Sequence, residues 1–224
     1  LAWSYCSTPT IEGHRIRKRA PETVVAALQR WRTAGFRRVF FVDNTFNLPE
    51  GYARTLCERM TAARLGIDWR CILYPGRMSA RLVEAMARAG CREVSLGFES
   101  GFQPMLDAMH KRFRLDDIRR AGRLLGDHGI RRMGFLLLGG PGETRQSVEE
   151  SLSFVDGLGL EAVKITVGLR IYPYTELARI AVREGVIQPD DDLLCPRFYI
   201  AEGLEAWLRE TVERWIAGRP DWFY

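Results

Sequence analysis

Cysteine and polar loop residues are the side chains of this sequence best suited to chemistry. The chain has five cysteines, and because no two form a Cys-x-x-Cys pair, their spacing does not suggest a zinc site. Three of them, Cys57, Cys71 and Cys91, lie among apolar neighbours, which predicts buried thiols that act as small hydrophobes. Cys6 differs because it lies in a polar, proline-bearing loop beside Tyr5.

A second group of candidates directly follows apolar runs of the chain. Asp43 comes after the run 39–42, and Glu99 and Ser100 come at the end of the run 93–98. Ligands of parallel α/β folds lie over the carboxyl ends of the strands. For Glu99 this placement favours a functional role over a helix cap or an ion pair with a neighbouring arginine. For Asp43 an Asx turn is an equally good interpretation.

A glycine-rich stretch, Gly139-Gly140-Pro141-Gly142, follows the apolar run 133–138. Glycines at a strand end let the backbone approach a ligand with no side chain in the way. The same stretch would also suit phosphate at a helix N-terminus, or simply form a tight turn, which is the commoner case. It has no Lys-Ser or Lys-Thr after the glycines, which disfavours a nucleoside-triphosphate loop.

Alternating helices and strands are expected to position these loops. The expected strands cover residues 39–42, 69–74, 93–98, 133–138 and 162–171, with helical patterns between them. Each helix-to-strand junction repeats one phrase, in which Gly is followed by an apolar residue and two mostly polar ones. This cadence is typical of repeated β/α units in one parallel sheet, and it fits both a curled barrel and a flat doubly wound sheet. A last amphipathic helix is marked by Leu204, Leu208, Val212 and Trp215.

Composition limits the class of protein. A length of 224 residues suits one barrel-like α/β domain, and a hydrophobic content of 46% is enough for a core. No apolar run approaches the length of a membrane span, so none is expected. The odd cysteine count and the lack of a signal-peptide pattern predict a reducing, cytoplasmic location. We interpret the short basic runs behind the net charge of +5 as solvated faces, and expect no nucleic-acid partner.

Taken together, the loops resemble those of the radical S-adenosylmethionine enzymes. The stretch 134–144 closely resembles that family's fifth-strand motif, whose backbone and apolar side chains border the adenine. The stretch 97–101 resembles its fourth-strand motif, in which an acid reaches polar groups of S-adenosylmethionine. The segment 170–175 resembles the Arg-Ile-Tyr-Pro-x-Thr phrase of the cobalamin-dependent branch. The similarity covers nearly the whole chain, in chain order.

The resemblance implies a fold, a set of cofactors and partners. The implied fold is α/β, a partial (β/α)6 TIM-like barrel of parallel strands that lacks its first strand, over residues 1–187. A C-terminal helical extension would cover residues 188–224. The implied cofactors are a 4Fe-4S cluster, which reductively cleaves S-adenosylmethionine to start radical chemistry, and cobalamin, through a domain absent from this chain. The implied partners are a small-molecule substrate, for C-methylation or cyclisation, and an external electron donor such as flavodoxin or ferredoxin.

Carried over residue by residue, the resemblance also implies a site. Cys6 would bind the cluster, Tyr5 would be the aromatic residue before it, and Glu99 would reach the polar groups of S-adenosylmethionine. The other residues expected to contact the cofactor are Asp43, Ser100, Gly139, Gly140, Pro141, Gly142, Arg170 and Tyr172. No residue is assigned to catalysis.

The chain departs from the family motif at Trp3. A Cys-x-x-x-Cys-x-x-Cys loop laid over Cys6 requires a second cysteine at position 3, and Trp cannot ligate iron. Trp3 is either a true substitution or an artefact of sequencing or of the chain boundary. Because cluster affinity comes from several soft ligands held together, we expect this chain alone to bind no stable cluster and to be inactive.

Two other functions remain open at the level of sequence. One is a non-catalytic barrel that keeps a nucleotide cleft as a binding scaffold. The other is a barrel isomerase or aldolase that binds phosphate at its glycine-rich loop, which needs a Lys or a carboxylate pair facing the cleft. Neither a Lys nor a carboxylate pair in such a position is evident in the sequence. The histidines His14, His110 and His128 show no metal-ligand spacing and are expected at the surface or in helix caps.

Overall fold

A parallel sheet lies at the centre of the structure, a computed structural model that describes residues 3–13, 15–76 and 78–224. Within these ranges its strands are β1 (Arg38–Phe41), β2 (Asp68–Leu73), β3 (Cys91–Glu99), β4 (Arg131–Leu138), β5 (Ala162–Val167) and β8 (Trp222–Phe223), side by side in that order. Each neighbouring pair is parallel. The predicted α/β fold with a parallel sheet is therefore confirmed.

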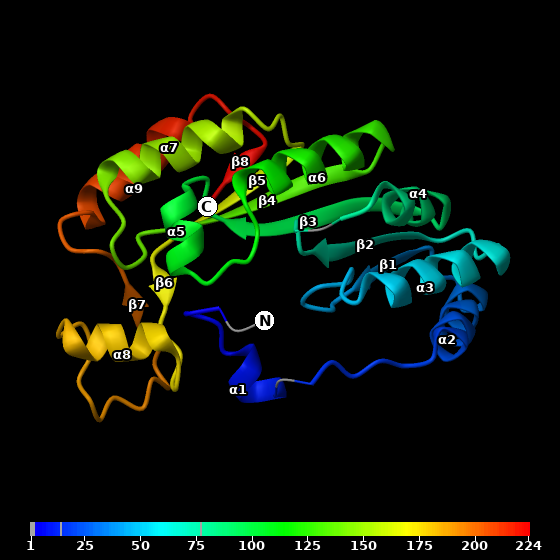
Figure 1. Cartoon of the computed structure of the whole chain (residues 1–224), viewed down its shortest axis with the longest axis horizontal. Coiled ribbons are helices and arrows are strands. Elements are labelled where there is room, and N and C mark those ends of the chain that lie inside the picture. Colours follow the sequence, from blue (N-terminus) through cyan, green and yellow to red (C-terminus); the bar gives the residue numbers. More distant parts are fainter. Residues whose placement is uncertain (1–2, 14, 77) are drawn as a thin grey trace.

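Long helices cover one side of the sheet in an arc (Figure 1). They are α2 (Pro21–Thr33), α3 (Glu50–Ala62), α4 (Ala80–Arg88), α6 (Leu115–Asp127), α7 (Arg145–Asp156) and α9 (Glu205–Ile216). The short helices α1 (Thr8–Glu12), α5 (Gln103–Ala108) and α8 (Glu176–Arg183) lie toward the end where the strands finish. No helix in the described ranges has the length and apolarity needed to cross a membrane.

The period-two alternation of strand side chains builds the core between the sheet and the helices. On β2, Trp69, Cys71 and Leu73 are buried, whereas Asp68 and Arg70, on the opposite face, are exposed. Alternate residues of a strand point to opposite faces, so one face of β2 packs on helices and the other does not. The predicted burial of three thiols, those of Cys57, Cys71 and Cys91, is confirmed.

Helix caps fix the starts of several helices. The sequence predicts Ser79 as the N-cap of α4, and its hydroxyl accepts a hydrogen bond from the Leu82 amide at 3.2 Å. Thr144 and Thr175 cap α7 and α8 in the same way, with the amides of Ser147 and Ala178 as donors. Both threonines stand in loops that follow strands, so the caps also hold the loops of the candidate site.

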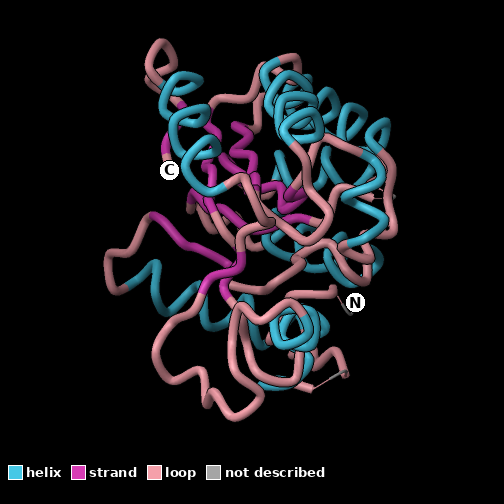
Figure 2. Tube along the Cα trace, turned by 90° about the vertical axis from the view of Figure 1, so that its left-hand side faces the viewer, coloured by secondary structure: helices cyan, strands magenta, loops and turns pink. Residues whose placement is uncertain are grey.

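The expected strand 162–171 is broken in two. The extended run ends at Val167, and Gly168 turns the chain with a φ of 82°, a conformation that favours glycine. The following strand β6 (Leu169–Arg170) leaves the sheet and pairs antiparallel with β7 (Phe198–Tyr199). Figure 2 shows this small ribbon extending away from the main sheet.

The C-terminal aromatic residues pack on the sheet and on α9, although Phe223 and Tyr224 remain exposed. Trp222 is buried, and it pairs with Val163 of β5 to add a sixth strand to the sheet. The Tyr224 hydroxyl donates a hydrogen bond to Glu213 of α9 at 2.8 Å. Residues 188–224 thus contribute two strands as well as α9, and the domain boundary at residue 187 remains a prediction.

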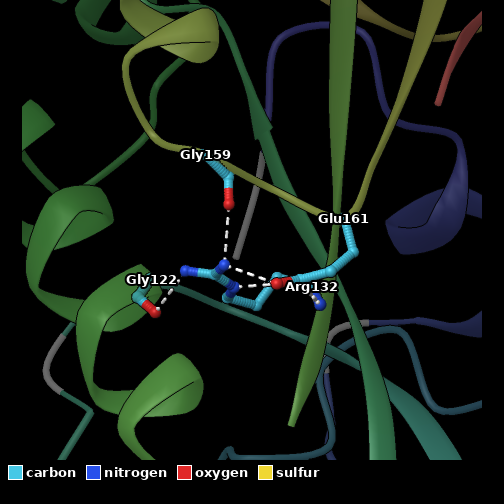
Figure 3. A network of polar contacts seen from close by, with 4 residues as sticks. All are labelled: Gly122, Arg132, Gly159 and Glu161. Atoms are coloured by element: carbon cyan, nitrogen blue, oxygen red, sulfur yellow. Dashed lines mark hydrogen bonds and ion pairs between the residues drawn. The ribbon is translucent and has the colours of Figure 1, made fainter. Parts of the chain in front are cut away.

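One polar network connects three elements, and its two charged residues, Arg132 and Glu161, belong to two of the helix-to-strand junctions whose pattern repeats (Figure 3). The Arg132 guanidinium donates to the carbonyl oxygens of Gly122 and Gly159, at 3.0 and 2.7 Å. It also donates to both carboxylate oxygens of Glu161, at 2.6 and 3.0 Å. The network ties α6, the start of β4 and the loop before β5 into one unit.

Candidate functional site

The end of β3 has an irregular backbone at Glu99. A bulge shifts the register between β3 and β4 after Leu96, and Glu99 has a φ of 71°, which is rare for a residue with a side chain. Bulges of this kind re-aim side chains, and strained backbone clusters at functional sites. The Glu99 carboxylate folds back over Gly97, whose added Cβ would lie 3.2 Å from Oε1. The backbone conformation at the end of β3 therefore sets the position of the Glu99 carboxylate, which the sequence singled out.

Lys111 is the partner of Glu99, and it could not be recognised in the sequence. Its Nζ lies 3.3 Å from Glu99 Oε1 and 3.4 Å from the Gly97 carbonyl oxygen. The residue is only 4% exposed, and burial lowers the pKa of Lys111 while the Glu99 carboxylate opposes this shift. In the sequence it stands in an ordinary basic run, and the apolar Met109 and Phe113 nearby were the only signal of burial.

The N-terminal loop closes over this ion pair. Lys111 Nζ lies 3.7 Å from the centroid of the Trp3 ring and 5.5 Å from that of Tyr5. Burial, followed by the nearby Glu99 and Cys6, raises the pKa of Tyr5 well above its usual range. Tyr5 and Glu99, two of the expected site residues, are thus brought together, and Cys6 lies next to them.

Backbone hydrogen bonds connect the same loop to two segments that follow strands. The Ser4 amide donates to the Met109 carbonyl oxygen at 3.4 Å, and the Ser4 carbonyl oxygen accepts from the Leu177 amide at 3.0 Å. Leu177 is in the first turn of α8, where amides lack partners within the helix. Thr175 caps that helix and donates its hydroxyl to the Tyr172 carbonyl oxygen at 2.7 Å. The Cys6 loop therefore bridges the segments that follow β3 and β6.

Cys6 also shares a pocket with Asp43. The pocket has a volume of about 280 Å³ and is also lined by Glu12, Asn44 and Arg17. The Asn44 side-chain amide donates to the Glu12 carboxylate at 3.4 Å, which joins the loop after β1 to α1. The carboxyl end of β1 thus meets the cysteine loop, and a role of Asp43 in cofactor binding remains a prediction.

The glycine-rich loop after β4 is held by Glu143, a residue not singled out in the sequence. One of its carboxylate oxygens accepts hydrogen bonds from the amides of Gly139 and Gly140, the latter at 3.0 Å. The other, Oε1, is buried and has no hydrogen-bond partner among the described residues. Burial raises the pKa of Glu143 to about 7, and the two backbone hydrogen bonds oppose the shift.

The glycines themselves are required by packing inside the protein. A Cβ on Gly139 would lie 3.3 Å from Leu208 of α9, and one on Gly140 would lie 3.2 Å from Met105 of α5. The neighbours of these two positions are therefore protein side chains. Gly142, with a φ of 76°, has open space beside it, and Pro141 is half-buried.

Three other expected site residues have clear protein partners. The Ser100 hydroxyl is fully buried, 3.0 Å from the Ser151 hydroxyl, and accepts from the Phe102 amide at 3.1 Å. These contacts pack the loop after β3 on α7. Arg170 is exposed, and its guanidinium lies 4.9 Å from the centroid of the Tyr172 ring. A role of these residues in cofactor binding remains a prediction.

The described residues do not fit an iron–sulfur cluster. Such clusters are bound by several thiolates, and Cys6 is the one cysteine of the described part of the N-terminal loop. Cys57, Cys71 and Cys91 are buried, and Cys195 is exposed in the loop before β7. Among the described residues, no group of three or more His, Cys, Asp or Glu side chains could hold a metal ion.

Comparison with known proteins gives a consistent set of relatives. The model of the Radical SAM superfamily matches residues 4–155. An uncharacterized methyltransferase of Pyrococcus horikoshii is 26% identical over 82% of this chain and 40% of its own length. The tryptophan 2-C-methyltransferase of Streptomyces laurentii is 25% identical over 79% of this chain and 32% of its own length.

The fold is also that of a solved methyltransferase. The radical S-adenosylmethionine methyltransferase TsrM from Kitasatospora setae, with cobalamin and a 4Fe-4S cluster bound, has a TM-score of 0.76. It is 24% identical, and the similarity covers 82% of this chain and 35% of TsrM. The chain thus spans 40% and 32% of the length of the two curated relatives reported above.

Proposed function

The chain belongs to the radical SAM superfamily, and from this membership we propose that it is the S-adenosylmethionine-binding core of a cobalamin-type methyltransferase. Enzymes of this family use a 4Fe-4S cluster and S-adenosylmethionine. The bound cofactors supply the radical and methyl-transfer chemistry of the complete protein. The residues of this chain bind and orient these cofactors, and they exclude water from the site.

The observation that carries the proposal is the convergence of the Cys6 loop with the Glu99–Lys111 pair at the carboxyl ends of the strands. The Lys111 Nζ atom joins the two, 3.3 Å from Glu99 Oε1 and 3.7 Å from the Trp3 ring centroid. Buried polar atoms that lack a partner support a ligand here, because such atoms are costly when left unsatisfied. Trp3 Nε1 and Glu143 Oε1 are two of them among the described residues.

Each expected residue has a proposed part in this site. Glu99 accepts hydrogen bonds from the polar groups of S-adenosylmethionine, and the backbone of residues 139–142 borders the adenine. Asp43, Arg170 and Tyr172 complete the rim of the site from the ends of β1 and β6. Because the described residues do not fit a cluster, we propose that the 224-residue chain binds S-adenosylmethionine but is inactive alone.

The same proposal includes the methyl acceptor, the electron donor and the cellular location of the enzyme. A second structure of TsrM contains tryptophan as substrate, and we propose that the acceptor here is also a small organic molecule. An external electron donor of the flavodoxin or ferredoxin type and a cytoplasmic location complete the proposal. Residues 1–187 form the core and residues 188–224 its extension.

Calorimetric titration of the whole chain with S-adenosylmethionine tests the proposal. We expect saturable binding that Glu99→Gln weakens about tenfold, as loss of one charge-assisted hydrogen bond would. Glu84→Gln on α4, an exposed acid paired with Arg88, is the matched control and should not change the affinity. Equal affinity in the Glu99→Gln variant would reject the site.

Two further measurements separate the alternatives. Titration with inorganic phosphate should give no heat, whereas binding of phosphate without S-adenosylmethionine would favour a barrel isomerase or aldolase. Anaerobic reconstitution with iron and sulfide, followed by absorbance in the iron–sulfur charge-transfer bands, should show no stoichiometric iron. Stable, stoichiometric iron in this chain would contradict the proposed inactivity.

A further inference from the structure

The Lys111 ammonium is enclosed by groups from two distant parts of the chain. The end of β3 contributes Glu99 Oε1 at 3.3 Å and the Gly97 carbonyl oxygen at 3.4 Å. The N-terminal loop contributes the Trp3 ring at 3.7 Å and the Tyr5 ring at 5.5 Å, measured to the ring centroids. The Lys111 side chain is 0% exposed. Its charge is therefore balanced entirely by protein groups.

The two aromatic rings act as one surface. Trp3 and Tyr5 are stacked, with ring centroids 6.4 Å apart and an interplanar angle of 16°. Trp is the best of the aromatic residues for binding a cation on its face, and the attraction grows when the cation is removed from water. A buried ammonium without such partners would be strongly destabilising. The contact of Trp3 with Lys111 thus stabilises the loop and the cation together.

This arrangement disagrees with what the cluster motif requires of position 3. The motif needs a thiolate there, pointing toward the same irons as Cys6, whereas the indole of Trp3 faces the Lys111 ammonium. A thiolate has no aromatic face that could bind the Lys111 ammonium, and an indole has no atom that could ligate iron. One residue at position 3 can serve only one of these purposes.

We infer that Trp3, Tyr5, Lys111 and Glu99 form a clamp that holds the Cys6 loop against the sheet without a metal. The loop is then ordered by the clamp and by its two backbone hydrogen bonds, from Ser4 to Met109 and from Leu177 to Ser4. Iron and sulfide add nothing to its order. The inference does not depend on the proposed function, because it concerns the loop and not the binding of S-adenosylmethionine.

Hydrogen exchange of backbone amides in the whole chain, measured by mass spectrometry without iron, tests the clamp. Trp3→Ala should speed exchange in residues 4–12 up to about 30-fold, the factor that a desolvated cation–π contact corresponds to. Trp3→Phe keeps an aromatic face and should retain most of the protection. Trp31→Ala, a half-exposed Trp of α2, is the matched control and should leave residues 4–12 unchanged.

The Lys111 side of the clamp needs a double variant. Lys111→Met alone leaves the Glu99 charge without its partner, so Lys111→Met is combined with Glu99→Gln to remove both charges. We expect residues 4–12 to lose protection in the double variant as they do in Trp3→Ala. The amides of β3 serve as the internal reference that the fold is intact, and Trp3→Phe gives the comparison if Trp3→Ala unfolds.

Two results would overturn the inference. One is unchanged protection of residues 4–12 in both Trp3→Ala and the double variant. The other is a wild-type loop that exchanges freely in the absence of iron and becomes protected only after anaerobic loading with iron and sulfide. Binding of S-adenosylmethionine, measured separately by calorimetry, distinguishes failure of the clamp from failure of the proposed function.

Discussion

Arg219 donates two hydrogen bonds to the Asp156 carboxylate, at 2.9 and 3.0 Å, from the C-terminal segment to the end of α7. The same guanidinium lies 4.7 Å from the Trp215 ring centroid and 5.4 Å from that of Trp222. The two indole rings are stacked, with centroids 6.1 Å apart. This one side chain therefore joins α7, α9 and the edge strand β8.

Arg219→Ala should destabilise the protein by about 1–2 kcal/mol, because it removes a bidentate ion pair and two cation–π contacts that are partly exposed. Urea unfolding at neutral pH measures the free energy of unfolding of the variant and the wild type. Arg88→Ala is the matched control, since Arg88 forms an exposed pair with Glu84 within one helix. Its effect should stay below about 0.5 kcal/mol. Equal losses in the two variants would mean that β8 does not depend on Arg219.

Glu161→Gln should destabilise the protein by about 1–3 kcal/mol at neutral pH, because the Arg132 network loses its charge-assisted hydrogen bonds. Burial opposes ionisation of Glu161, but the hydrogen bonds and charge of Arg132 outweigh it and hold the pKa of Glu161 below its usual range. A lowered pKa gives stability that is complete above the usual carboxyl range and is lost as the pH falls.

The pH profile provides the check on Glu161. Between about pH 5 and 3 the wild type should lose more stability than Glu161→Gln, so that the two curves converge in acid. Glu58→Gln, at an exposed pair with Arg54, is the control and should run parallel to the wild type. If the curve for Glu161→Gln stays parallel to that of the wild type, the lowered pKa assigned to Glu161 is contradicted.

Glu143→Gln should flatten the stability profile in a different pH window. Because burial raises the pKa of Glu143 to about 7, the folded state holds a proton that the unfolded chain releases near pH 4.5. Stability from this group is complete below about pH 4 and is lost as the pH rises to about 7. The total loss is on the order of 3 kcal/mol.

Gln keeps an acceptor for the amides of Gly139 and Gly140, so the fold of the loop should survive the change. Urea unfolding from about pH 4 to 8 measures the slope, and the exposed Glu149→Gln on α7 is the control. A slope unchanged in Glu143→Gln would show that this carboxyl does not titrate in the window.

Thiol titration with an aromatic disulfide reagent should divide the five cysteines by burial. Cys195 is exposed and should react first, whereas Cys57, Cys71 and Cys91 are buried and should react only on unfolding. Burial raises the pKa of Cys57 and Cys71, so little thiolate forms there at neutral pH. Cys195→Ser should remove the fast phase, and fast reaction of four or five thiols in the native protein would contradict the core packing.

Local patterns were enough to predict the elements and the order of most of them. The apolar runs, the junction phrase and the N-cap Ser79 depend on neighbours within a few residues, and the structure confirms them. The placement of Glu99 and Asp43 at strand ends also followed from the sequence, because carboxyl ends of parallel strands share one edge.

The remaining features depend on contacts between residues far apart in the chain. Lys111 looks like one more surface cation until Trp3 and Glu99 are brought around it, over 100 residues away in one case and 12 in the other. Trp222 becomes a strand because β5 offers it an open edge. Burial and charge balance are properties of the folded surroundings, so the amino-acid sequence determined which elements form, and only the tertiary structure decided which side chains meet.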